Sequence, residues 1–143
     1  MRLPFVNDFA TAVKPRFAFL TESHGYNLVY EQSAPLIYES PKLRIDVTRD
    51  REQTSFSVRA RGDYRDYDPD ILALLLEGAT EYTRSSRAPD FTPGAAAGFL
   101  LSHLTEIEKL FAPERVAETM QRGDHLKNDR GEKLFSAGRK NSS

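Results

Sequence analysis

The residues best suited to chemistry lie in one acidic run, GDYRDYDPD, at residues 62–70. Asp66, Asp68 and Asp70 alternate along it, as the first three ligands of an EF-hand calcium loop do. The sixth position of such a loop is a glycine that permits a sharp turn, and here it is Ile71. Residues 71–76 are apolar throughout, which is typical of a core helix. We therefore expect no metal and no cofactor at this run.

The acidic run fits the beginning of a helix better. Asp68 could cap that helix, Pro69 suits its first turn, and Asp70 suits the positive end of its dipole. This interpretation leaves two carboxylates and two tyrosines, which look exposed, without a role. They are Asp63, Tyr64, Asp66 and Tyr67.

Charge is distributed unevenly around the acidic run. Residues 42–61 carry a net charge of +3, and residues 62–81 carry a net charge of −5. Tyr and Arg are common anchors of protein interfaces, so a basic strand beside an acidic, tyrosine-bearing loop indicates a partner-binding surface. We assign that surface to Arg59, Arg61, Asp63, Tyr64, Asp66 and Tyr67. The alternative is that these charges only line the solvated face of a sheet.

Other residues offer little for catalysis. His24 follows a predicted helix, His103 shares a helix with Glu106 as half of a metal site at most, and His125 has no neighbouring ligand in the sequence. The chain has no cysteine, no nucleophile elbow and no glycine-rich phosphate loop. We therefore assign no catalytic residue.

Length and charge restrict the class of protein further. The 143 residues suit a single domain, and a net charge of −1 with a pI near 6.3 disfavours nucleic acid as a partner. The N-terminus lacks the pattern of a signal peptide, and no apolar run approaches the length of a membrane span. We expect a cytoplasmic protein with no membrane association.

The first half of the chain predicts a helix followed by an antiparallel meander. Phe5, Phe9, Val13, Phe17 and Leu20 recur at helical spacing, with a kink expected at Pro15 and a left-handed stop at Gly25. Four segments rich in β-branched and aromatic residues follow, at 26–32, 36–39, 43–48 and 54–61. The last two alternate apolar and polar residues, as strands with one buried face do.

The second half predicts two to three helices packed on one face of that sheet, which gives an α+β fold. One helix begins at Pro69 and continues to Tyr82, a polar linker covers 84–90, a second helix covers 93–111, and a short third helix begins at Pro113. Residues 1–123 form the predicted domain. Apolar periodicity fades afterwards, so we expect 124–143 to be a flexible or loosely docked tail that adds little stability.

A single predicted core joins the sheet to the helices. Its members are Phe17, Leu20, Ile45, Val47, Phe56, Val58, Leu72, Leu75, Leu101 and Leu104.

Several short motifs also carry a resemblance to known proteins. They are FAFL at 17–20, HGYNLV at 24–29, YES at 38–40, LRI at 43–45 and FSV at 56–58. Over roughly residues 5–76 the chain resembles small uncharacterised bacterial α+β proteins, and some similar proteins are immunity partners in toxin systems. The resemblance implies this order of elements and a bacterial origin. It carries over no catalytic residue.

The sequence leaves three function classes open. We favour a non-catalytic, immunity-like module that binds another protein, with a basic partner suited to the acidic loop. An enzyme whose site is assembled from residues distant in the sequence is the main alternative, and a homo-oligomeric structural module, such as a homodimer, is the third.

Overall fold

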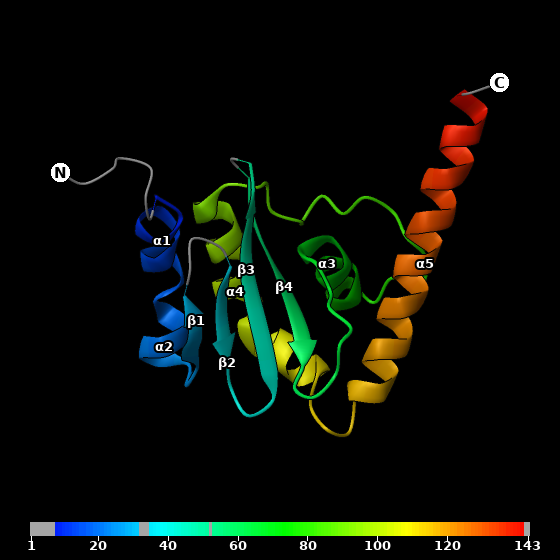
Figure 1. The fold of residues 1–143 in the computed structure, drawn as a ribbon. Coiled ribbons are helices and arrows are strands. Elements are labelled where there is room, and N and C mark those ends of the chain that lie inside the picture. Colours follow the sequence, from blue (N-terminus) through cyan, green and yellow to red (C-terminus); the bar gives the residue numbers. More distant parts are fainter. Residues whose placement is uncertain (1–7, 32–34, 52, 142–143) are drawn as a thin grey trace.

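The computed structural model describes residues 8–31, 35–51 and 53–141, which adopt an α+β fold with the predicted order of helix, sheet and helices (Figure 1). The helical N-terminal segment comprises α1 (Asp8–Val13), the 3-10 helix η1 (Lys14–Phe17) and α2 (Phe19–Ser23). The strands are β1 (Asn27–Glu31), β2 (Leu36–Glu39), β3 (Leu43–Asp50) and β4 (Gln53–Ala60). The later helices are α3 (Pro69–Glu77), α4 (Pro93–Leu110) and α5 (Val116–Asn141). None of these helices combines the length and the apolar character needed to cross a membrane.

The described strands form one four-stranded antiparallel meander in the order β1-β2-β3-β4. Leu43, Ile45 and Val47 of β3 are buried, while Arg44 and Asp46 on the opposite face are partly exposed. The predicted register is therefore confirmed. In Figure 1, α4 lies behind the sheet, where it packs against β4 and η1.

The N-terminal helix is interrupted where the sequence predicts. α1 ends at Val13, the following 3-10 turn contains Pro15, and the chain leaves α2 through Gly25 at a φ of 75°. A proline lacks the amide hydrogen that an α-helix needs, so the tighter turn takes over. Val13, Phe17 and Leu20 are buried, as predicted. Phe5, the side chain of Phe9, residue 32 and the ends of the chain at 1–7 and 142–143 lie outside the described parts.

The predicted core is confirmed except at Leu101, whose side chain is 50% exposed. Its neighbour Leu100 and Leu104 one turn later are fully buried. Successive residues of a helix project about 100° apart, so Leu101 is turned away from the direction in which Leu100 points. Leu101 therefore lies at the solvent side of α4.

Helix α3 begins at Pro69, as predicted, but ends sooner. Gly78 adopts a left-handed φ of 72° and its N–H closes onto the carbonyls of the last turn, so the chain leaves the helix before Tyr82. Asp68 precedes the helix without capping it, because its carboxylate pairs with Arg130 of α5 instead.

The largest difference from the sequence prediction is α5. A continuous helix runs from Val116 to Asn141 and crosses the predicted boundary at Gly123. It packs beside α3, and its C-terminal end extends past the rest of the fold (Figure 1). The third helix is therefore longer than the short one predicted from Pro113. Flexibility of α5 after Gly123 in solution stays a prediction.

Candidate functional site

The acidic loop, residues 62–68 between β4 and α3, is fixed at both ends by backbone hydrogen bonds. At its start, Gly62 adopts a φ of 85° and the Asp63 N–H donates to the Ala60 carbonyl at 3.1 Å. At its end, Tyr67 and Val58 exchange two hydrogen bonds of 2.9 and 3.0 Å, which add a short bridge to β4. The side chains between these points are therefore held on a defined backbone.

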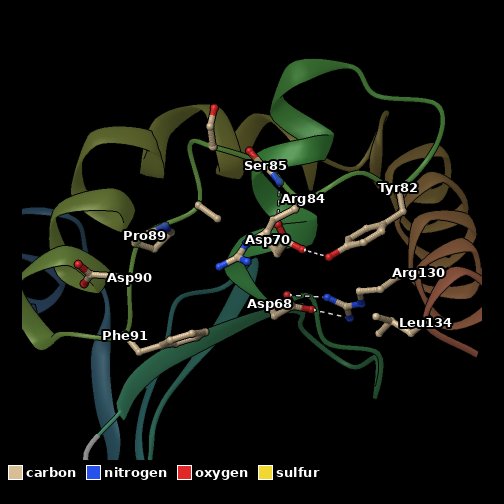
Figure 2. Close-up of a pocket in the computed structure, with 12 residues that line it drawn as sticks. Asp68, Asp70, Tyr82, Arg84, Ser85, Pro89, Asp90, Phe91, Arg130 and Leu134 are labelled. Carbon is tan, nitrogen blue, oxygen red and sulfur yellow. Dashed lines mark hydrogen bonds and ion pairs between the residues drawn. The ribbon is translucent and has the colours of Figure 1, made fainter. Parts of the chain in front are cut away.

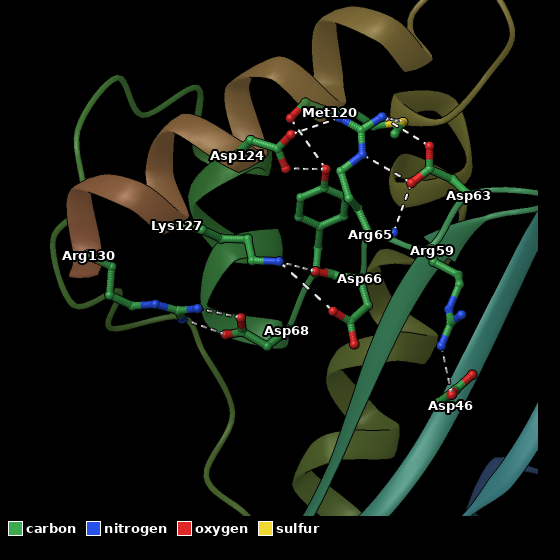
Figure 3. A network of polar contacts seen from close by, with 11 residues as sticks. Asp46, Arg59, Asp63, Arg65, Asp66, Asp68, Met120, Asp124, Lys127 and Arg130 are labelled. Atoms are coloured by element: carbon green, nitrogen blue, oxygen red, sulfur yellow. Dashed lines mark hydrogen bonds and ion pairs between the residues drawn. The ribbon is translucent and has the colours of Figure 1, made fainter. Parts of the chain in front are cut away.

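Arg65 joins the loop to α5 through two carboxylates (Figure 3). Its backbone N–H and its guanidinium donate to Asp63 at 2.8–3.0 Å, and Nη1 donates to Asp124 at 2.9 Å. The side-chain hydrogen bonds from Arg65, followed by the backbone one, lower the pKa of Asp63 to about 2. The same contacts raise the pKa of Arg65. Asp63 is therefore ionised and engaged with its neighbour.

Tyr67 lies underneath α5, and the expectation that its ring is exposed is wrong. The residue is fully buried, and its hydroxyl donates to Asp124 at 2.8 Å and to the Met120 carbonyl at 3.3 Å. Gly123 faces the ring so closely that a Cβ there would lie 2.5 Å from Cε1. Burial, followed by the hydrogen bond to Asp124, raises the pKa of Tyr67.

Tyr64 has the opposite environment, because 84% of the residue is exposed. Its ring has the Arg65 guanidinium 6.0 Å from its centroid. Both flanking residues, Asp63 and Arg65, are bonded to one another, so the ring projects from an anchored backbone.

Two further aspartates of this region pair with α5. Lys127 Nζ donates to the Asp66 carbonyl at 2.8 Å and lies 3.9 Å from its carboxylate. Arg130 makes a two-pronged contact with Asp68, with both distances at 3.0 Å (Figure 3). Lys127 and Arg130, which follow Gly123 in α5, therefore offset much of the negative charge of the acidic loop.

The predicted basic residues, Arg59 of β4 and Arg61 directly after it, also have local partners. Arg59 approaches Asp46 of β3 at 3.4 Å, and Asp46 binds Arg44 more closely, at 2.7 and 3.0 Å. Arg61 donates to the Ser40 carbonyl at 2.7 Å and pairs with Glu39 at 3.0 Å. These arginines thus follow the sheet and the turn after β2, and the partner-binding role assigned to them stays a prediction.

A groove of about 730 Å³ opens beside the acidic loop (Figure 2). Its lining comes from Asp68, Asp70, Tyr82, Arg84, Ser85, Ser86, Ala88, Pro89, Asp90, Phe91, Arg130 and Leu134. The Tyr82 hydroxyl donates to Asp70 at 2.6 Å, and the Ser85 N–H donates to the other oxygen at 3.3 Å. Burial, followed by the hydrogen bond from its hydroxyl to Asp70, raises the pKa of Tyr82. No pattern in the sequence indicates the groove, because segments that are distant in the chain build it.

The groove lacks the arrangement of a nucleophilic site. The Ser85 hydroxyl donates to Glu77 at 3.0 Å rather than to a histidine. His24 contacts Phe19 edge to face, His103 contacts Phe99 at a tilt, and His125 contacts the Thr80 carbonyl at 3.1 Å. Within the described residues, no three His, Asp or Glu side chains lie close enough to hold a metal ion.

The functional residues that the sequence did not reveal are those of α5. Asp124, Lys127, Arg130 and Lys133 contact the acidic loop or the residues after α3. Their spacing of three residues is a helical pattern written in charge instead of apolar residues, and it was the one available signal.

Comparison with protein-family models, with curated proteins and with solved structures finds no match for this chain.

Proposed function

We propose that this protein is a non-catalytic, cytoplasmic module that binds another protein through the acidic loop, with Tyr64 as the anchor. The observation that carries the proposal is the exposure of 84% of Tyr64 on a loop held by hydrogen bonds at both ends. A large aromatic ring loses little conformational entropy when its backbone is already fixed, and such rings are frequent hot spots.

The charges around Tyr64 favour a basic partner. The Asp66 side chain remains about half exposed (54%) and meets Lys127 only at 3.9 Å, so it is available to a second cation. A basic partner would associate faster at low salt because opposite potentials steer the encounter. A basic nuclease toxin, the kind of partner that the immunity-like resemblance suggests, has this chemistry.

The groove supports catalysis less well than the loop supports binding. Asp70 is engaged by Tyr82 and by the Ser85 amide, and Asp68 is engaged by Arg130. A catalytic carboxylate must be able to exchange a proton with substrate, and these two already serve donors of the protein itself.

The test is capture of the partner from the source organism with the tagged full chain, followed by calorimetry with the purified partner. Tyr64→Ala should weaken binding by roughly 2 kcal/mol, which is about 30-fold. Tyr30→Ala is the matched control, because Tyr30 is also exposed but lies in β1 at the far edge of the sheet. Equal affinity of Tyr64→Ala and the wild type would refute the proposal.

Charge is tested best at Asp66. Asp63 is unsuitable, because its carboxylate holds Arg65 and a reversal there would disturb the loop itself. Asp66→Lys should mainly slow association, and the effect should fade as salt increases.

A further inference from the structure

Residues 124–136 of α5 cover part of the acidic loop, and the contacts between them are largely polar. Among the described side chains after Gly123, Leu126 is the buried apolar one, and the others are exposed or partly exposed. The buried contacts of α5 with Tyr67 are made by Met120 and Gly123, which precede this segment. The docking of residues 124–136 therefore depends mostly on charges and hydrogen bonds.

Three cations spaced three residues apart make several of these contacts, and Asp124, His125 and Asp129 make others. Lys127 Nζ donates a hydrogen bond to the Asp66 carbonyl and lies 5.1 Å from the centroid of the Tyr67 ring. Arg130 pairs with the Asp68 carboxylate. Lys133 donates to the Tyr82 carbonyl at 2.6 Å. The loop region thus already receives a helix that presents three cations to it, and that helix belongs to the same chain (Figure 3).

We propose that residues 124–136 of α5 form an autoinhibitory segment. This segment occupies part of the partner-binding surface and is displaced by a basic helix of the partner. The inference rests on the proposed function, since it describes the regulation of the same loop. The displaced surface would offer the partner the place of Leu126 in addition to Asp66, Asp68 and the exposed Tyr64.

The energetics suit a segment that exchanges. Exposed ion pairs are individually weak and are screened by salt, and a polar helix without tertiary contacts is only marginally stable in water. α5 is favoured by its attachment to the chain, which gives it a high effective concentration. A partner helix competes successfully if it repeats the basic spacing and adds apolar contacts at the place of Leu126.

The first experiment uses α5 itself as the probe. A fluorescent peptide of residues 116–141 is titrated into the full chain and into the full-length variant Lys127→Glu/Arg130→Glu/Lys133→Glu. The variant should bind the peptide about tenfold more tightly than the wild type, because each exposed pair shifts the docking equilibrium by about two- to threefold. A peptide carrying the same three reversals is the control and should bind neither chain.

Equal affinity of both chains for the wild-type peptide would overturn the proposal. A second outcome would also overturn it: a concentration-dependent wild-type dimer that the triple variant dissociates. The occupant of the surface would then be α5 of a second copy.

A second measurement covers the case in which the variant does not fold. Hydrogen exchange of the wild-type chain is followed between about 0.05 and about 0.5 M salt, a range over which surface charges become strongly screened. Amides of residues 127–136 should exchange faster as salt increases, while those of β3 should not. Equal protection of both segments at every salt concentration would refute autoinhibition.

These results separate the two proposals. The peptide test needs no partner, and Tyr64 makes none of the contacts of α5 described above. If Tyr64→Ala loses partner binding but the wild type and the triple variant bind the peptide with equal affinity, autoinhibition alone is refuted. Tighter peptide binding by the variant with full partner binding by Tyr64→Ala would refute the role of Tyr64 alone.

Discussion

The contact between Gly123 and Tyr67 offers a direct test of how α5 docks. A Cβ at Gly123 would lie 2.5 Å from Cε1 and 2.9 Å from Cδ1 of the ring, well inside the ordinary contact distance of about 3.5–4.0 Å between carbons. The ring has little freedom to withdraw, because it is fully buried and its hydroxyl is bonded to Asp124 and Met120. In Gly123→Ala either the ring or the helix must move.

The expected magnitude follows from three contributions. Overpacking a buried site costs about 1–3 kcal/mol, and a displaced hydroxyl, which has one proton to donate, loses a hydrogen bond worth about 1 kcal/mol. The better helix propensity of alanine returns about 1 kcal/mol. We therefore expect Gly123→Ala to lower the free energy of unfolding by about 1–3 kcal/mol.

Gly131→Ala is the matched control in the same helix. Gly131 is exposed and no atom lies within 4 Å of the added Cβ, so helix propensity alone should act and stabilise the protein by about 0.5–1 kcal/mol. Urea unfolding followed by circular dichroism measures both variants. If Gly123→Ala stabilised the chain as much as Gly131→Ala does, α5 would not pack on Tyr67.

Three further predictions concern the core, the loop and the end of the chain. Leu104→Ala should cost about 2–5 kcal/mol in urea unfolding, whereas Leu101→Ala should cost less than about 1 kcal/mol, since the latter side chain is half exposed. The pKa of Asp63 is lowered to about 2, so its contribution to stability is present above its unfolded pKa and is lost as the pH falls toward 2. The difference in melting temperature between the wild type and Asp63→Asn should therefore be largest near neutral pH and shrink in acid. A chain that ends at Gly123 should melt more than about 5 °C lower, because it loses buried Leu126 and the partner of Tyr67; a smaller change would support the flexible tail that the sequence predicts.

The sheet was predictable because its signals are local. Alternation of apolar and polar residues in β3 and β4 fixes which face is buried, and a shift of one residue would expose Ile45 and Val47 together. The glycine that ends α2 acts within a few residues as well, at Gly25, whereas the stop at Gly78 was missed because apolar residues continue past it to Tyr82. Element order and register in this part of the chain therefore follow from neighbouring residues.

Helix α4 shows where local periodicity is insufficient. Leu100, Leu101 and Leu104 all fit an apolar stripe, because a stripe read from sequence is wide. The sheet and η1 pack against one side only and bury Leu100 and Leu104, which leaves Leu101 in solvent. The choice between adjacent leucines depends on where the partner element lies, and that information is absent from the helix itself.

The acidic loop fails as a local prediction for a related reason. Tyr67 is surrounded in the sequence by aspartates and arginine, so it looks exposed, yet its burial is decided by Gly123, far along the chain. Helix α5 is likewise invisible to an apolar pattern, because most of its contacts after Gly123 are made by charges.

The net charge of a segment therefore says little about the field that the segment presents. Arg65 holds Asp63, Lys127 meets Asp66 and Arg130 holds Asp68, so the loop's charge becomes a set of defined pairs. A partner attracted by that charge must first replace those pairs, and adding salt weakens the partner's attraction and the competing α5 together. Specific recognition by this loop consequently requires something that the pairs do not supply. Tyr64, the aromatic ring that the loop leaves in solvent, is the residue placed to supply it.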